Sequence, residues 1–389
     1  MSTLRVDGIR HNSATSDAIT TAADGTCTAK LTSVGGGQLS HRNLIINGDY
    51  RIAQRGVTST SNGYQTMDRW YVYAANTGNT VTTSQVAITS GGAYDDGFRK
   101  AAKMSLSGAG TLTTNTEILF YQKIEAQDLA NSGWNYKSSS SFVTLSFWVK
   151  ASTAQAYAAH IRTEDGTAYL YAFTYAVAQA NVWQKITKTI PGNSNITIDD
   201  DNGSGLRVYV GVPAVGTQFD GATADTWIVS AADKFPAIPS TWLTAGASTF
   251  ELTGVQLEVG DTATSFEHRL LSDELLRCYR YYYRLKGENN KTYMIGMSDN
   301  DNVNIYGFFH FPVEMRTAPT SIEQNGTAGH YKVRRDTTKS CTAVPSFVDA
   351  FPFYCRVNFP SSGHGWGTGQ MLWCQGGSSS SYIGFPAEL

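Results

Sequence analysis

The first residues to weigh are those that could carry out catalysis. None of the seven histidines is paired at metal-ligand spacing, and the chain contains no GxSxG, HExxH or P-loop motif. Cleavage of a glycosidic bond needs two carboxylates roughly 5–10 Å apart. Several acidic side chains could supply such a pair in space, but no local motif selects two of them: Glu125, Glu164, Asp165, Glu251, Glu258 and Glu267. We therefore expect no catalytic residue and a protein that is not an enzyme.

Two of these carboxylates have a structural interpretation. Glu258 and Glu267 lie on either side of a Gly-Asp break and close to Arg269. A carboxylate in such a place can accept hydrogen bonds from a guanidinium group or from backbone amides. We predict that both glutamates hold the local fold together in this way.

The acidic run 199–203 (DDDNG) has the composition of a calcium-binding loop. Asp199 and Asp201 would be the ligands, and a structural calcium ion would then be the one cofactor of the protein. A loop of the EF-hand type also needs a bidentate glutamate at its twelfth position. Counted from Asp200, that position is Gly211. A solvated turn is therefore the favoured interpretation, with calcium as the alternative.

Aromatic residues offer the best candidates for a binding site. Trp134 and Tyr136 lie in the loop-like sequence NSGWNYKSSS, and Trp366 lies in SSGHGWGTG. Sugars stack their C–H faces on such rings while polar groups contact the hydroxyls. We predict that these three aromatics bind glycan. A further row is spaced by two, shares one sheet face and is interpreted as core: Tyr169, Tyr171, Phe173 and Tyr175.

The composition is typical of short strands and turns. Of the 389 residues, 41% are hydrophobic and 16% are charged, while Gly (37), Tyr (21), Phe (17) and Trp (8) are abundant. Such a chain is long enough for two to three domains. The net charge of −2 gives no electrostatic basis for binding nucleic acid.

Membrane insertion and secretion are not expected. No stretch approaches the ~18 apolar residues of a membrane span, and the start MSTLRVDGIR has no apolar signal core. The five cysteines are odd in number and scattered, which argues against a zinc site and against a full disulfide framework. We expect synthesis in a reducing cytoplasm without export by secretion.

The middle of the chain predicts a β-sandwich. Segments with strand-like alternation recur at short spacing and are separated by turn residues, which argues for an all-β, two-sheet sandwich of jelly-roll size over residues 43–269. The predicted strands are 67–75, 80–88, 99–108, 118–126, 142–152, 156–165, 167–177, 182–190, 206–214, 226–232 and 250–260. Only residues 128–132 indicate a helical turn.

The stretch 248–284 marks a change of periodicity. Apolar and polar residues alternate as far as Val259, and the spacing becomes helical from Leu271. We predict a linking helix over 270–286, followed by a smaller C-terminal β domain over 287–389. The apolar stripe of this helix would serve assembly or dock on the sandwich, and its members are Leu271, Leu275, Tyr279 and Tyr282.

Residues 1–42 differ from the rest of the chain. They are rich in Ser, Thr, Ala and Gly and carry too little apolar surface to form a domain alone. A floppy tail is one interpretation. We favour an extended attachment segment that is ordered by its partners.

Several motifs, in order, resemble a recurring class of tail-fibre proteins of tailed bacteriophages, especially marine phages and cyanophages. The resemblance covers essentially the whole chain, and the run VQLEVG…FEHR…C-R-YYY is its most specific part. The motifs are LRVDGIRHNS (4–13), NLIINGDYRIAQRG (43–56), MDRW (67–70), YQKIE (121–125), SFWVK (146–150), LTGVQLEVGDTATSFEHR (252–269), ELLRCYRYYYR (274–284), FPVEMRTAPT (311–320) and FPAEL (385–389).

This resemblance implies a homotrimer with jelly-roll domains similar to carbohydrate-binding modules. Residues 1–42 would attach to a tail or adaptor protein, and the fibre would bind a host surface glycan or receptor. The protein would belong to the virion and assemble in the host cytoplasm. Two alternatives remain open: a capsid or collar decoration protein without receptor binding, and a tailspike that depolymerises glycan.

Overall fold

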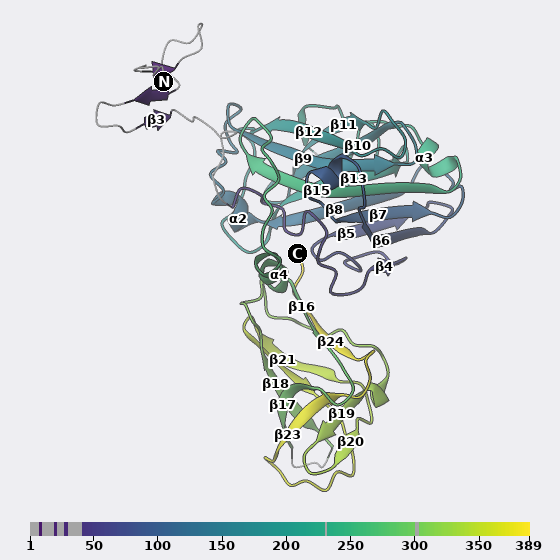
Figure 1. Cartoon of the computed structure of the whole chain (residues 1–389), viewed down its shortest axis with the longest axis vertical. Helices are drawn as coiled ribbons and strands as arrows, with labels where there is room; N and C mark the ends of the chain where they lie inside the picture. Colours follow the sequence, from purple (N-terminus) through teal and green to yellow (C-terminus); the bar gives the residue numbers. More distant parts are fainter. Residues whose placement is uncertain (1–7, 10–18, 22–26, 30–40, 230–231, 300–302) are drawn as a thin grey trace, which may run out of the picture.

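The computed structural model describes residues 8–9, 19–21, 27–29, 41–229, 232–299 and 303–389. A two-layered β-sandwich forms one body, a smaller β domain forms the other, and helix α4 lies at the junction between them (Figure 1). The predicted all-β class with a jelly-roll sandwich and a C-terminal β domain is confirmed. Most of the predicted attachment segment 1–42 lies outside the described residues, and its described pieces form three short strands, β1 (Gly8–Ile9), β2 (Ile19–Thr21) and β3 (Cys27–Ala29).

The sandwich consists of two six-stranded antiparallel sheets. Every strand segment predicted between residues 67 and 260 contains a strand. The bounds are β4 (Thr58–Ser59), β5 (Tyr71–Ala75), β6 (Val81–Ala87), β7 (Lys100–Leu106), β8 (Glu117–Glu125), β9 (Phe142–Ala151), β10 (Ala156–Thr163), β11 (Tyr169–Ala176), β12 (Gln184–Pro191), β13 (Ser204–Val215), β14 (Trp227–Val229) and β15 (Ser248–Val259). The sheet orders are β14-β11-β10-β13-β8-β5 and β12-β9-β15-β7-β6-β4.

The core of the sandwich lies between the two sheets, where alternate side chains of each strand meet. Trp70 is fully buried and stacks on Phe120 with ring centroids 4.9 Å apart. Tyr171, Phe173 and Tyr175 are also buried in this core, as the spacing by two predicted. Three short helices lie at the ends of strands: α1 (Gly92–Asp95), α2 (Ala126–Ala130) and α3 (Thr241–Thr244).

A buried histidine makes the sandwich sensitive to acid. His160 lies between Tyr209 and Phe235, and its Nδ1 is 3.0 Å from the backbone oxygen of Lys234, so Nδ1 carries the proton. Burial lowers the pKa of His160 to about 4. As the pH falls, His160 binds a proton near pH 6.5 in the unfolded chain but only near pH 4 in the folded chain. Stability from this group is therefore complete above pH 6.5 and falls by about 3 kcal/mol as the pH drops to 4.

We expect a His160→Gln variant to be less stable at pH 7 but to lose less stability on acidification. The measurement is the free energy of unfolding in urea at several pH values for both proteins. The difference in unfolding free energy between the two proteins should become smaller by about 3 kcal/mol from pH 7 to pH 4. A gap that stays constant over this range would show that His160 does not titrate as its burial requires.

The linking helix is shorter than predicted. Helix α4 (Leu271–Tyr279) ends where strand β16 (Tyr282–Lys286) pairs with β24 (Tyr382–Pro386), so a helix reaching residue 286 is wrong. Tyr282 and Tyr283 have high β propensity, and they pair with β24, which lies at the far end of the chain.

The predicted apolar stripe of the linking helix is wrong at Tyr282, which lies outside the helix, while an assembly role for the other members stays a prediction. Leu271 is 54% exposed, and Glu274 and Cys278 are the buried residues of α4. Leu275 packs against a small cluster at the base of the sandwich. Tyr279 contacts Tyr283 edge-on, at 4.6 Å between ring centroids. Tyr282, the fourth member, is fully buried within the chain and belongs to β16.

The C-terminal β domain contains a seven-stranded antiparallel sheet and the β16–β24 pair, around a hydrophobic core of its own. The remaining bounds are β17 (Thr292–Ser298), β18 (Ile305–His310), η1 (Ala328–His330), β19 (Tyr331–Arg334), β20 (Thr338–Ser340), β21 (Ser346–Phe351), β22 (Tyr354–Asn358) and β23 (Met371–Gly376). The sheet order is β20-β19-β23-β17-β18-β22-β21. Among the described residues, no helix has the length and apolar character needed to cross a membrane.

Candidate functional site at the junction

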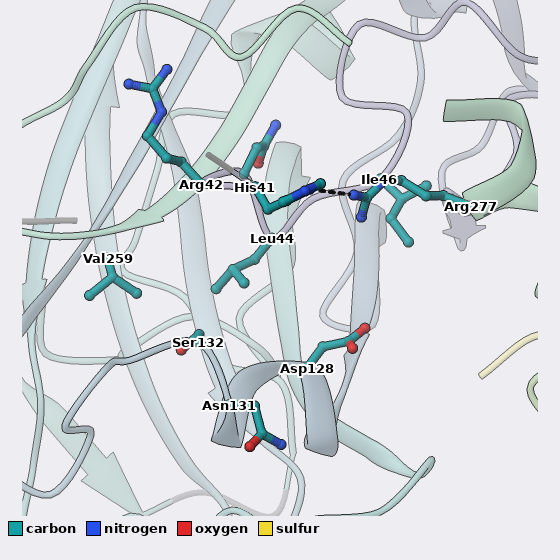
Figure 2. Close-up of a pocket in the computed structure, with 10 residues that line it drawn as sticks. His41, Arg42, Leu44, Ile46, Asp128, Asn131, Ser132, Val259 and Arg277 are labelled. Atoms are coloured by element: carbon teal, nitrogen blue, oxygen red, sulfur yellow. Dashed lines mark hydrogen bonds between the residues drawn. The ribbon is translucent and has the colours of Figure 1, made fainter. Parts of the chain in front are cut away.

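A groove runs along the junction between the sandwich, α4 and the C-terminal β domain. It consists of two hollows of about 400 Å³ and about 660 Å³, which share Ile46, Asp128 and Arg277 in their walls. Figure 2 shows the first hollow. We call the two together the junction groove, and its lining residues are His41, Arg42, Asn43, Leu44, Ile46, Gln127, Asp128, Asn131, Ser132, Asp201, Asn202, Val259, Arg277, Arg280, Tyr281, Glu314 and Arg316.

Helix α2 forms one wall of the junction groove. Leu129 is fully buried in the sandwich core, and Asp128 and Asn131, on the other side of the helix, line the groove. The side-chain amide of Asn131 donates to Asp200 Oδ1 at 2.9 Å and to the backbone oxygen of Gln127 at 2.8 Å. These two bonds hold the amide in one orientation, with its oxygen available to a ligand.

Helix α4 and the residue that follows it each supply an arginine to the opposite wall. Arg277 donates to Nδ1 of His41 at 2.8 Å (Figure 2). Arg280 makes a bidentate ion pair with the fully buried Glu125, at 2.7 and 2.8 Å. Burial alone would raise the pKa of Glu125, but the hydrogen bonds from Arg280 lower it, so the pair stays charged. Desolvation and the nearby Glu125 carboxylate raise the pKa of Asp128.

Arg316 closes the groove from the C-terminal β domain. Its guanidinium donates to the backbone oxygens of Ala387 (2.9 Å), Glu388 (2.8 Å) and Asn202 (3.1 Å). The last of these belongs to the sandwich, so Arg316 ties the two bodies together across the groove. Desolvation lowers the pKa of Arg316.

The groove can recognise a polar ligand that also has apolar faces. Fixed donors and acceptors converge from three sides, and pockets of several hundred Å³ with such groups are typical ligand sites. Hydroxyl groups can pair with the arginines, carboxylates and amides, while C–H faces rest on the apolar part of the lining. That apolar part consists of Leu44, Ile46, Val259 and Tyr281.

The predicted anchoring role of two carboxylates is confirmed beside the groove. Glu267 Oε2 accepts from the backbone N–H of Asn43 at 3.0 Å and from Arg269 Nη2 at 2.8 Å. These contacts lower the pKa of Glu267 against the effect of burial. Glu258 accepts from the backbone N–H of Thr264 at 2.8 Å. Both residues therefore hold the end of β15 and the start of the sandwich in place.

The three aromatics predicted to bind glycan do not offer free rings. Trp134 is 2% exposed and Trp366 is 6% exposed. Trp366 donates through its indole N–H to Asp336 at 2.9 Å and stacks on His364. Tyr136 is half-buried against the sandwich core. The flanking Gly and Ser residues do mark loops, but each aromatic turns inward and fastens its loop, so the prediction of exposed sugar-stacking rings is wrong.

The acidic run 199–203 forms an exposed turn. Asp201 Oδ1 accepts from the backbone N–H of Gly203 at 2.8 Å, which is the bond of an Asx-type turn. The backbone N–H of Asp199 donates to Asp165 at 2.9 Å. Within the described ranges, no group of three or more His, Cys, Asp or Glu side chains could hold a metal ion. Asp201 instead lines the junction groove.

Sequence reasoning missed the groove itself. Its walls come from six parts of the chain that are far apart in sequence: 41–46, 127–132, 201–202, 259, 277–281 and 314–316. The one signal that pointed to it was the density of charged and amide residues in the motifs around Arg277 and Arg316.

No protein-family model and no curated protein matches this chain in sequence. Among solved structures it is similar to the enzymatically active domain of tailspike protein 4 of bacteriophage CBA120, with 14% identity, 56% of this chain, 21% of that chain and a TM-score of 0.30. It is also similar to the N-terminal cellulose-binding domain of a β-1,4-glucanase from Cellulomonas fimi (12% identity, 55% of this chain, 99% of that chain, TM-score 0.26). A third similar structure is the N-terminal CBM22 tandem domain of Xyn10C from Paenibacillus barcinonensis (10% identity, 90% of this chain, 97% of that chain, TM-score 0.27). With TM-scores of 0.30 or less, these similarities are too weak to show the function of this chain.

Proposed function

We propose that the protein is a trimeric tail-fibre component of a bacteriophage virion that binds a glycan of the host surface in the junction groove. Its N-terminal segment would attach it to the tail. The observation that carries the binding role is the convergence of oriented polar side chains over an apolar strip in one groove of sufficient size. The sequence motifs that resemble tail fibres support the virion role.

Several features favour binding without catalysis. Glu125 is engaged on both oxygens by Arg280, and neither carboxyl group of the pair Asp128 and Asp201 belongs to a catalytic motif. Three weak sites on one fibre would gain avidity, because the second and third contacts form at high effective concentration. A decoration protein and a glycan depolymerase remain the competing functions.

The test is binding of purified protein to an array of bacterial lipopolysaccharides and capsular polysaccharides. We expect binding to a subset of these glycans and a loss of at least tenfold in affinity for Arg277→Ala, because a hydrogen bond to a charged group contributes about 1.5–3 kcal/mol. Lys137→Ala removes an exposed positive charge outside the groove and is the matched control.

The size of each bound polysaccharide, measured before and after incubation, separates the competing functions. Unchanged size together with groove-dependent binding supports a fibre. Fragmentation would identify a depolymerase. No interaction with any polysaccharide would favour a decoration protein.

A further inference from the structure

One face of the seven-stranded sheet in the C-terminal β domain is apolar and uncovered by the described residues. In antiparallel pairs, opposed residues point to the same side, and the register sets Trp373 beside Ile295 and Ile295 beside Phe308. A second row sets Met371 beside Met297. We call this surface the outer face and define it by Ile295, Met297, Phe308, Phe351, Met371 and Trp373, each 45–65% exposed.

The three central strands have the sequence of strands covered on both sides. TYMIGMS (β17), IYGFFH (β18) and MLWCQG (β23) place apolar residues at both parities. One parity is buried in the domain core and includes Met294, Leu372 and Cys374. By contrast QKITKTIP (β12) of the sandwich alternates, with polar residues on its exposed side. A continuous apolar run is expected where a second layer covers the strand.

We infer that further copies of this chain cover the outer face and that this face holds the proposed trimer together. The inference rests on the trimer of the proposed function and assigns its contact surface. The six side chains expose on the order of 600 Å² of apolar surface. That is at the upper end for the largest patch of a monomer and close to one partner's share, about 800 Å², of a stable interface.

The layout of the outer face also fits a protein partner. Its centre is aromatic and aliphatic. Arg334 on β19 flanks it beside Trp373, and Arg356 on β22 lies between Phe308 and β21, the strand of Phe351. An apolar centre with a polar rim is typical of protein interfaces. A hollow of about 310 Å³ beside Trp373 and Met371 can receive a side chain of the neighbouring copy. Most of the lining of this hollow is apolar, with Arg335 and Asp336 as its polar members, so an apolar side chain suits it better than a sugar.

This assignment differs from assembly through α4. Of the residues predicted for assembly, Tyr282 is fully buried within its own chain and Leu275 packs on the sandwich base. The outer face, on the other hand, lies on the C-terminal β domain, away from the junction groove. Copies can therefore associate through it while each groove stays open.

The test is the solution mass of the full chain, measured by light scattering and sedimentation over a wide concentration range. We expect the wild-type chain to be an oligomer. For Trp373→Lys and Ile295→Lys we expect the dissociation constant of the oligomer to rise about thirtyfold or more, as for loss of a central contact. Val182→Lys alters an exposed apolar residue of the sandwich and is the control. Thermal unfolding of each variant checks its folding, and the milder Met371→Gln replaces any variant that does not fold.

The outcomes separate this inference from the function it builds on. A wild-type chain that is monomeric at every concentration overturns both the outer-face contact and the trimer. An oligomer whose mass is unchanged in Trp373→Lys, Ile295→Lys and Met371→Gln overturns the outer-face contact alone. If the wild-type chain is a monomer and Trp373→Lys no longer binds polysaccharide, the outer face binds glycan and the inference is overturned. Dissociation confined to the outer-face variants supports it.

Discussion

A Glu388→Ala variant should lose about 3–5 kcal/mol of stability at the junction. The Glu388 carboxylate pairs with Arg69 at 2.8 Å and with Arg55 at 3.1 Å, and the Arg69 side chain is 1% exposed. Removing one partner of a buried ion pair leaves a charge without compensation, which costs about that much. Urea unfolding followed by tryptophan fluorescence should show a lower midpoint.

The control for this variant is Glu288→Ala, which removes an exposed glutamate of the same domain and should change the midpoint little. Glu388→Gln keeps the shape of the side chain and one acceptor oxygen but loses the charge and one of the two hydrogen bonds from arginine, so it should fall between alanine and wild type. Equal stability of Glu388→Ala and Glu288→Ala would show that the ion pairs contribute nothing net.

An Asn47→Ala variant should lose a similar amount, about 3–5 kcal/mol. Asn47 is fully buried, and its side chain donates to the backbone oxygens of Ile52 (2.8 Å) and Asp68 (3.0 Å) and accepts from the Ile52 N–H (3.0 Å). Each buried polar group left unpaired costs about 1–3 kcal/mol. Its φ of 57° also lies in the left-handed region, where alanine adds about 1 kcal/mol. Thermal and urea unfolding measure the loss.

Asn181→Ala separates these two contributions. Asn181 has a φ of 61° but is exposed, so the same substitution there measures the backbone cost alone. We expect Asn181→Ala to lose about 1 kcal/mol. If both variants lost the same amount, the hydrogen bonds of Asn47 would carry no stability of their own.

Local periodicity was enough to predict the sandwich. Alternation over segments such as FVTLSFWVKA reports one buried side of a strand, and each of these segments did form a strand. The linking helix failed at its end because the fate of Tyr282 depends on β24, a partner that local spacing does not reveal. Likewise, exposure of Trp134 and Trp366 depends on what packs over them and not on the Gly and Ser residues around them.

Several of the motifs that resemble tail fibres meet at the junction. The backbone N–H of Asn47, in NLIINGD, donates to Glu274 at the start of ELLRCYRYYYR. Arg280 of that second motif pairs with Glu125 of YQKIE, and Arg316 of the 311–320 motif bonds to the backbone of Ala387 in FPAEL. Residues of these motifs therefore link the sandwich to the α4 segment and hold the end of the chain at the junction. The groove could not be found from the sequence, since it exists only after six distant parts of the chain have come together.

The return of residues 387–389 to the sandwich sets a condition on chimeric proteins that carry the C-terminal β domain. Strand β24 leads the chain back to the junction, where Glu388 meets Arg55 and Arg69 and the Leu389 backbone oxygen accepts from Tyr64 (Figure 1). A cassette of residues 287–389 grafted onto another sandwich would bring Glu388 without its arginines. Productive exchange of this domain between proteins therefore requires a recipient that already has both arginines, or a graft that carries residues 55–69 along with residues 287–389.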